Sequence, residues 1–124
     1  MTGWTTAQLE AIGAAAEIEI APDRADSSPG PATTIWVVRV GDDLLVRSYR
    51  GPNGRWYRRT RRTGRGRIRT ATSDYRVEFL AADPSIRPQV DAAYRTKYGR
   101  HPSYVAPLLA DSVAGTTLQL RKLD

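Results

Sequence analysis

Two β-rich runs, separated by three residues, limit the folds that this chain can adopt. Residues 34–40 and 44–49 are rich in branched and aromatic side chains, and residues 41–43 have the composition of a hairpin turn. The apolar side chains of the first run point to both faces of a strand, Ile35 and Val37 to one and Trp36 and Val38 to the other. Because both faces need burial, we expect a central strand or a strand of a closed barrel.

The rest of the chain mixes shorter strands with helices. Thr5 and Gln8 have the spacing of a capping box, which predicts that a helix starts there. Residues 23–32 have the composition of a loop, and residues 55–62 of a short helix or an irregular basic lobe. Further strands are expected over residues 17–20, 67–72, 75–82 and 116–123, and further helices over 83–99 and, as a short turn, 104–109.

These elements add up to five or six strands and two or three helices. The strands are neighbours in sequence, so most of their pairings should be antiparallel. A chain of 124 residues can bury one substantial core, so we expect a single domain over residues 1–124. The predicted fold class is α+β, a small and mostly antiparallel split β-barrel flanked by helices.

The composition excludes several kinds of chemistry. The chain has no cysteine and one histidine, which removes disulfides, thiol nucleophiles and cysteine or histidine metal centres, so no metal site is expected. His101 lies in a Gly-Arg-His-Pro segment typical of an exposed loop. No apolar run approaches the length of a membrane helix, and residues 1–10 lack the pattern of a secretory signal. We therefore expect a cytoplasmic protein that does not bind membranes.

An arginine-rich segment dominates the charge distribution. The net charge is +6, and no Asp or Glu occurs between Leu44 and Ser73. The arginines of this stretch are Arg47, Arg50, Arg55, Arg58, Arg59, Arg61, Arg62, Arg65, Arg67 and Arg69. Arg47 falls on a largely apolar face of the second β-rich run, where a charge needs a partner or a ligand.

The arginine segment suits an anionic ligand. Arginine grips phosphate in a bidentate way, and Trp56 and Tyr57 lie inside the segment, where they could stack on a ring system. A phosphorylated cofactor such as a flavin would use a few converging arginines, whereas single-stranded nucleic acid would use a groove of them. The alternative is a solvated basic face, with Trp56 and Tyr57 in the core.

The predicted helix over residues 83–99 holds the candidate catalytic residues. Tyr94 and Tyr98 lie on one helical face with Lys97 nearby, so they could line a pocket beside the barrel, with a tyrosine as proton donor. In the alternative interpretation, the tyrosines seat the helix on the barrel. Asp91 and Arg95 have the i, i+4 spacing of a supportive ion pair. Gly64 and Gly66 are interpreted as breaking the basic segment in a simple turn.

Three segments carry a resemblance to a known family. They are TIWVVRVGDDLLVRSYRG (34–51) with the following Trp56-Tyr57, DAAYRTKYG (91–99) and TTLQL (116–120). In order and spacing they resemble the bacterial DUF2255 family, a domain of unknown function. That family is similar to the FMN-binding split barrels, which include pyridoxamine-phosphate oxidases and deazaflavin-dependent nitroreductases.

The resemblance implies a cofactor site. The segment from Val46 to Arg59 would hold the phosphate of FMN or of a deazaflavin. Its phosphate ligands would be Arg47, Ser48, Arg50 and Arg58, and Trp56 would pack against the ring. Related barrels usually form homodimers with the ligand at the subunit interface. The segment departs from the flavin enzymes because it lacks the lysine-bearing signature of the oxidases and is more basic than one phosphate requires.

Three functions remain open from the sequence. The first is a split-barrel protein that binds a phosphorylated flavin or deazaflavin, either as a small oxidoreductase or without catalysis. The second is a cofactor-free protein that binds or tailors a small molecule in the same barrel pocket. The third is a nucleic-acid-binding module that uses the arginine-rich segment.

Overall fold

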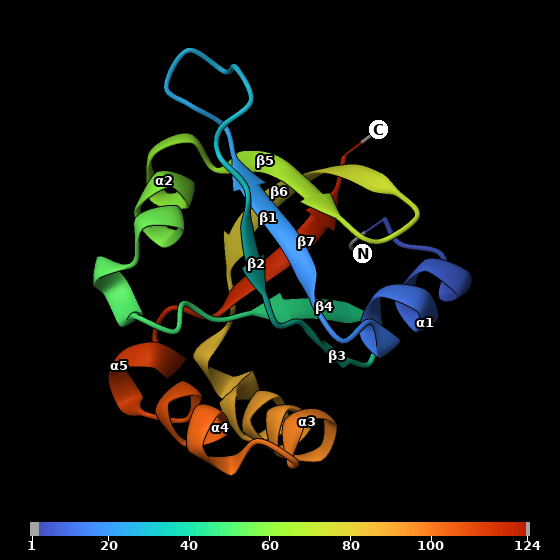
Figure 1. Ribbon diagram of the computed structural model, residues 1–124, viewed down its shortest axis with the longest axis vertical. Coiled ribbons are helices and arrows are strands. Elements are labelled where there is room, and N and C mark those ends of the chain that lie inside the picture. Colours follow the sequence, from blue (N-terminus) through green and yellow to red (C-terminus); the bar gives the residue numbers. More distant parts are fainter. Residues whose placement is uncertain (1–2, 124) are drawn as a thin grey trace.

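The computed structural model describes residues 3–123, which form one antiparallel sheet surrounded by helices (Figure 1). The strands are β1 (Ile18–Pro22), β2 (Thr33–Ile35), β3 (Val38–Val40), β4 (Asp43–Val46), β5 (Arg65–Arg69), β6 (Asp74–Ala81) and β7 (Leu118–Lys122). The helices are α1 (Thr6–Ala14), α2 (Arg55–Thr63), α3 (Arg87–Tyr98), α4 (Pro102–Leu108) and α5 (Asp111–Ala114), with 3-10 turns at Gly51–Asn53 and Pro84–Ile86.

The sheet curls, and its two edge strands, β2 and β3, are consecutive in the sequence. The strand order is β2-β1-β5-β6-β7-β4-β3, which places β2 and β3 at opposite ends of the sheet. Only Trp36 and Val37 separate these two strands in the sequence. Every strand pairing is antiparallel. The predicted α+β split barrel is confirmed.

The sheet has seven strands among the described residues, where the sequence predicted five or six. The difference arises at the first β-rich run, which is two strands joined at Trp36 and Val37 and not one continuous strand. The Val37 amide donates a hydrogen bond to the Tyr98 hydroxyl at 3.2 Å, and its carbonyl accepts one from Lys97 Nζ at 2.6 Å. Side chains of α3 thus replace the strand neighbour that Val37 lacks.

The run nevertheless packs on both faces, as predicted, with Val37 and Val38 buried and Ile35 and Trp36 partly buried. Ile35 and Val37 belong to the barrel core, a cluster inside the curled sheet. Trp36 and Val38 belong to the helix-side core, a second cluster between the sheet and helices α3 to α5. The Trp36 ring stacks on Tyr98, with 3.9 Å between the ring centroids and an interplanar angle of 2°.

The basic segment at residues 55–62 is an amphipathic helix. Trp56, Tyr57 and Thr60 of α2 are buried, and most of its arginines face outward. Gly64 ends the helix in the left-handed conformation, with a φ of 70°. Gly66 does not belong to a turn, contrary to the prediction. It lies within β5, where a Cβ atom would stand 2.5 Å from the carbonyl oxygen of Ala21.

Helix α1 matches its sequence pattern, and the C-terminal region contains one helix more than the sequence predicted. The capping box of Thr5 and Gln8 is present at the start of α1. The region expected to hold one short helical turn contains two helices, α4 and α5, which pack with α3 against one end of the sheet (Figure 1). None of the helices described within residues 3–123 combines the length and the apolar character needed to cross a bilayer.

Candidate functional site

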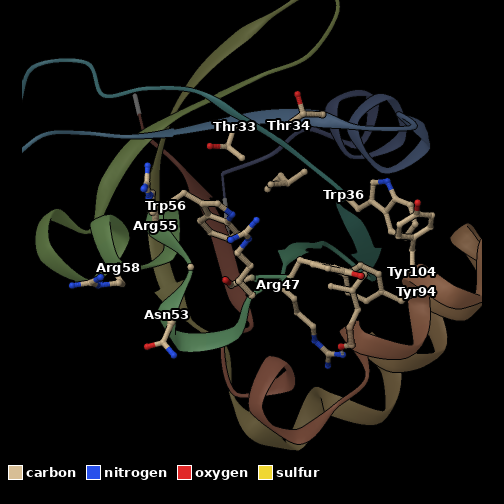
Figure 2. A pocket seen from close by; sticks show the side chains of 16 residues that line it. Thr33, Thr34, Trp36, Arg47, Asn53, Arg55, Trp56, Arg58, Tyr94 and Tyr104 are labelled. Carbon is tan, nitrogen blue, oxygen red and sulfur yellow. Dashed lines mark hydrogen bonds between the residues drawn. The ribbon is translucent and has the colours of Figure 1, made fainter.

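A pocket of about 870 Å³ opens beside the barrel, between β2, the segment from β4 to α2, and helices α3 and α4 (Figure 2). Figure 2 shows three walls: Thr33 and Thr34 on one, Arg55 and Trp56 on another, and Trp36, Tyr94 and Tyr104 on the third. The lining residues are Thr33, Thr34, Ile35, Trp36, Arg47, Ser48, Tyr49, Arg50, Asn53, Gly54, Arg55, Trp56, Arg58, Tyr94, Tyr104 and Leu108.

The pocket brings together all five predicted cofactor-binding residues and one of the two candidate catalytic tyrosines. The five residues expected to hold a cofactor line it: Arg47, Ser48, Arg50, Trp56 and Arg58. Tyr94 lines it as well. Tyr98 is not a lining residue, although it lies one turn from Tyr94 on the same helix.

Arg47 is buried beneath the pocket and tied to the surrounding protein. Its Nη1 donates to Asp91 Oδ1 at 2.6 Å and to the carbonyl of Leu108 at 2.8 Å, and its Nε donates to the Thr117 hydroxyl at 2.9 Å. The side chain has no solvent exposure. The partner expected for a charge on this apolar face is therefore Asp91.

Asp91 pairs with Arg47 and not with Arg95, the i, i+4 partner that the sequence suggested. Its carboxylate contacts Arg47 at 2.6 Å and Arg87 at 3.6 Å, and Arg95 is exposed on another part of α3. Asp91 can reach Arg47 because β4 and α3 both border the helix-side core. This contact crosses 44 positions in sequence, so i, i+4 spacing could not reveal it.

The start of α2 forms the cationic end of the pocket. Gly54 is the N-cap and no side chain caps the helix, so the first-turn amides have no side-chain acceptor. Arg50, Arg55 and Arg58 line this end, are exposed, and form no ion pair within residues 3–123. The Arg58 side chain extends away from the centre of the pocket (Figure 2). An anion at this end would meet helix amides and uncompensated positive charge.

Ser48 shapes the turn that leads into α2. Its hydroxyl donates to the carbonyl of Gly51 at 2.7 Å, and its amide donates to the Thr116 hydroxyl at 2.9 Å. A Cβ atom at Gly54 would lie 2.3 Å from the Ser48 hydroxyl oxygen, so the turn packs closely on this side chain. Ser48 itself is buried.

Trp56 and Tyr57 belong to the barrel core and not to the exposed arginine face. Their exposed fractions are 7% and 6%. Trp56 also reaches the pocket wall, whereas Tyr57 does not line it. Neither residue therefore presents an exposed ring beside the outward arginines of α2.

The two candidate tyrosines differ in what their hydroxyls contact. The Tyr98 hydroxyl donates to the carbonyl of Ala16 at 3.0 Å and accepts from the Val37 amide, so it seats α3 on the barrel. Burial raises the pKa of Tyr98 to about 12. The Tyr94 hydroxyl is buried, and its proton has no acceptor among the described residues. Burial raises the pKa of Tyr94 well above the ordinary value, and the Arg47 charge and backbone beside it only partly offset that rise.

Lys97 also serves the seating of α3. Its ammonium group donates to the Val37 carbonyl and lies 5.0 Å from the centroid of the Tyr98 ring. Burial lowers the pKa of Lys97 to about 8. Lys97 does not line the large pocket.

Several lining residues carried no signal in the sequence. Thr33 and Thr34 come from an edge strand, and Tyr104 from a helix that the sequence barely indicated. Trp36 could have been suspected, because it stands on the second apolar face of a two-faced run. Across residues 3–123, no cluster of His, Cys, Asp and Glu side chains could hold a metal ion.

Sequence comparison identifies the family of the chain. The family described as "uncharacterized protein conserved in bacteria" (DUF2255) matches residues 8–120. No curated protein is significantly similar in sequence to the chain.

One similar solved structure is that of a protein named "F420 Reductase". It aligns with a TM-score of 0.51 over 93% of each chain, at 14% sequence identity. The likeness supports the split-barrel fold.

Proposed function

The chain belongs to the bacterial DUF2255 family, and we propose that it binds a phosphorylated flavin or deazaflavin in the pocket between β2, α2 and α3. The phosphate would lie at the start of α2, and the ring would lie against Trp56. The observation that carries the proposal is the pairing of a cationic end with an aromatic wall of Trp36, Tyr94 and Tyr104 in one pocket. The volume of about 870 Å³ lies within the usual range for small-molecule sites.

The cationic end is suited to a phosphate for a specific reason. Arg50 and Arg55 have no carboxylate partner within the described residues, so an incoming phosphate does not compete with an existing ion pair. The uncapped start of α2 adds amide donors. Ser48 supports the turn at this point through the hydrogen bond from its hydroxyl to the Gly51 carbonyl.

A bound flavin or deazaflavin would supply hydride transfer, which no side chain of this protein can perform alone. The chain's own residues would bind the phosphate, place the ring beside Trp56 and shield it from water. We therefore propose a small oxidoreductase as the activity. Two supports favour a deazaflavin: the similar structure is named as an F420 reductase, and the arginines of α2 continue beyond the pocket, where an anionic extension of the ligand could lie.

A binding titration tests this proposal. Trp fluorescence of the purified protein is followed with FMN, with riboflavin and with coenzyme F420, at low and at high salt. We expect saturable quenching by FMN or F420 that persists at high salt, and weaker binding of riboflavin because it lacks the phosphate. No saturable binding of any of the three would overturn the proposal and favour a cofactor-free pocket.

Two variants separate the cationic end from the general positive charge. Arg55→Gln should weaken FMN binding by about tenfold, which corresponds to one charge-assisted hydrogen bond. Arg62→Gln is the matched control, because Arg62 is on the same helix, exposed and outside the pocket. Equal losses in the two variants would show that FMN binds to the surface charge and not in the pocket.

Nucleic acid is the second candidate ligand, and the unpaired arginines favour it. Of the ten arginines between Arg47 and Arg69, only these two end members form ion pairs within residues 3–123. With Trp56 and Tyr57 buried, the outward face offers phosphate contacts without those two rings as stacking platforms. Such binding should weaken steeply with salt, so salt-resistant binding of an oligonucleotide would argue against this purely electrostatic mode.

We also propose a homodimer with the pocket near the subunit interface. The large aromatic side chains with the most exposure among the described residues are Tyr49, at 49%, and Tyr104, at 58%, and both line the pocket. A second copy that covered them would also close the pocket to water. Sedimentation equilibrium of the wild type and of a Tyr49→Glu, Tyr104→Glu variant tests this, and a monomeric wild type would contradict it.

A further inference from the structure

Where the pocket borders the helix-side core, a part of its lining that we call the helix-side wall, two buried donors have no hydrogen-bond partner. They are Arg47 Nη2 and the Tyr94 hydroxyl, and they are the only unsatisfied buried side-chain polar atoms found within residues 3–123. Both residues line the pocket, and the Arg47 guanidinium lies 5.5 Å from the centroid of the Tyr94 ring (Figure 2). An unsatisfied buried polar group is costly, so two of them beside one pocket require an explanation.

The charge balance of this wall points to an uncharged ligand group. The positive charge of Arg47 is already compensated by Asp91 at 2.6 Å. A second anion at this wall would lose its hydration and find no unpaired positive charge in return. The cationic end of the same pocket does offer unpaired positive charges, on Arg50 and Arg55. A carbonyl oxygen needs only donors, and this wall offers two.

Resting on the proposed function, we propose that Arg47 Nη2 and the Tyr94 hydroxyl donate hydrogen bonds to a carbonyl oxygen of the ligand's ring. The two ends of the pocket then bind different parts of the ligand. Its charged groups bind at the start of α2, and the neutral carbonyl edge of its ring binds at the helix-side wall. Neither donor is exposed to water in the structure, so the wall has to shift slightly when the ring enters. The two unsatisfied donors favour that shift because binding gives each an acceptor.

The proposal predicts opposite effects of one substitution on stability and on binding. In Tyr94→Phe the buried hydroxyl is gone, and with it the cost of leaving it unsatisfied, so the ligand-free protein should melt about 2 to 6 °C higher. The same variant loses a donor to the ligand, so its Kd for FMN should rise about fivefold to tenfold.

Tyr98→Phe is the matched control, one turn away on α3. The Tyr98 hydroxyl has partners in Val37 and Ala16 and lies outside the pocket lining. Its removal should lower the melting temperature of the ligand-free protein by several degrees. The Kd for FMN should stay within about twofold of the wild type, because no donor to the ligand is lost.

The experiment measures thermal melting without ligand and the Kd for FMN and for 5-deaza-FMN in the wild type and both variants. A higher melting temperature with weaker binding in Tyr94→Phe supports the proposal. A melting temperature lowered as in Tyr98→Phe would show that the Tyr94 hydroxyl has a partner in the protein, and would overturn it. Unchanged FMN affinity in Tyr94→Phe overturns it too but leaves the proposed function intact. Failure of the wild type to bind FMN, 5-deaza-FMN and coenzyme F420 overturns both.

Discussion

Arg47 and Asp91 show how this protein keeps a charged side chain in its interior. The guanidinium has no solvent exposure, and a single carboxylate, a hydroxyl and a carbonyl take up most of its hydrogen bonds. A charge in such a position depends on its partner much more than an exposed charge does. Removing the carboxylate should therefore be far more costly than removing an exposed one from the same ion-pair network.

Asp91→Asn tests that dependence. Loss of the carboxylate leaves Arg47 buried and uncompensated, so the free energy of unfolding should fall by about 3 kcal/mol, measured by urea denaturation. Asp111→Asn is the control: Asp111 pairs with Arg87 at 2.8 Å, but its side chain is 95% exposed, and its loss should cost less than about 1 kcal/mol. Equal, small losses in the two variants would show that Arg47 does not depend on Asp91.

Lys97 should make the free energy of unfolding increase with pH in the alkaline range. Its pKa is lowered from 10.5 to about 8 in the folded protein, so between pH 8 and 10.5 the unfolded chain binds more protons. Stability should therefore rise with pH across this window. The pKa of Tyr98 is raised from 10.0 to about 12, so the folded state binds more protons between these values and stability should fall as pH rises through them.

The two shifts together predict a stability maximum near pH 10. Urea denaturation midpoints of the wild type at pH values from about 7 to 11 measure it. In Lys97→Met the rise above pH 8 should disappear while the fall at higher pH remains. An identical rise in the wild type and in Lys97→Met would assign it to another group.

Among the strands, β5 has an unusual constraint at Gly66. Its neighbours β1 and the Phe79 ring approach so closely that a Cβ atom would stand 2.5 Å from Ala21 O, 2.7 Å from Pro22 Cα and 3.0 Å from Phe79 Cε2. Two of these are backbone atoms, which cannot move aside alone. Gly66→Ala should therefore lower the free energy of unfolding by about 2 to 3 kcal/mol, measured by urea denaturation.

Gly115→Ala is the comparison for that measurement. At Gly115 the nearest atoms to a new Cβ are 3.6 and 3.8 Å away, and the residue has φ −67°, which alanine adopts freely. This variant should stay within about 1 kcal/mol of the wild type or gain slightly. A Gly66→Ala variant as stable as Gly115→Ala would mean that β1 and β5 separate more easily than their close contact suggests.

The sequence predicted elements whose evidence is local and missed those whose evidence is distant. The two faces of Ile35 to Val38 and the capping box of α1 follow from residues a few positions apart, and both were confirmed. The break between β2 and β3 could not be predicted, because the group that holds Val37 is Tyr98, 61 positions away. Alternation of side chains reports burial and does not report which strand is the neighbour.

The same distinction applies to the candidate site. Arg47, Ser48, Arg50, Trp56 and Arg58 lie close together in sequence, and a family resemblance was enough to group them. The threonines of β2 and Tyr104 of α4 join them only through the curl of the sheet and the packing of α4, which no local pattern encodes. The unsatisfied hydroxyl of Tyr94 was also invisible, since a tyrosine stripe alone does not reveal hydrogen-bond partners.

For the molecule as a whole, the arginines of α2 fall into two groups, those that line the pocket and those that lie outside it. Arg59 and Arg62 lie on α2 outside the pocket, so they can contribute to long-range attraction of polyanions without contacting a pocket ligand. A double variant, Arg59→Gln with Arg62→Gln, should reduce the salt dependence of binding to a single-stranded oligonucleotide. The slope of log K against log salt should fall by about 1.4, at about 0.7 for each lost phosphate contact.

The control for this variant is its affinity for FMN at high salt, which should match that of the wild type. Fluorescence titration measures both ligands on the same protein. If the double variant lost FMN binding in parallel with oligonucleotide binding, the pocket and the outer face of α2 would be a single anion site.

The position of β7 has a consequence for synthesis on the ribosome. This strand, drawn in red in Figure 1, lies between β6 and β4, and every other strand of the sheet precedes it in the chain. Until Leu118–Lys122 has emerged, β4 and β6 have no neighbour on the side that faces β7. The nascent protein therefore carries two unpaired strand edges until that point, the state in which chains associate wrongly with one another. Because β7 fills both gaps at once, we expect wrong association of chains mainly in the interval before its release.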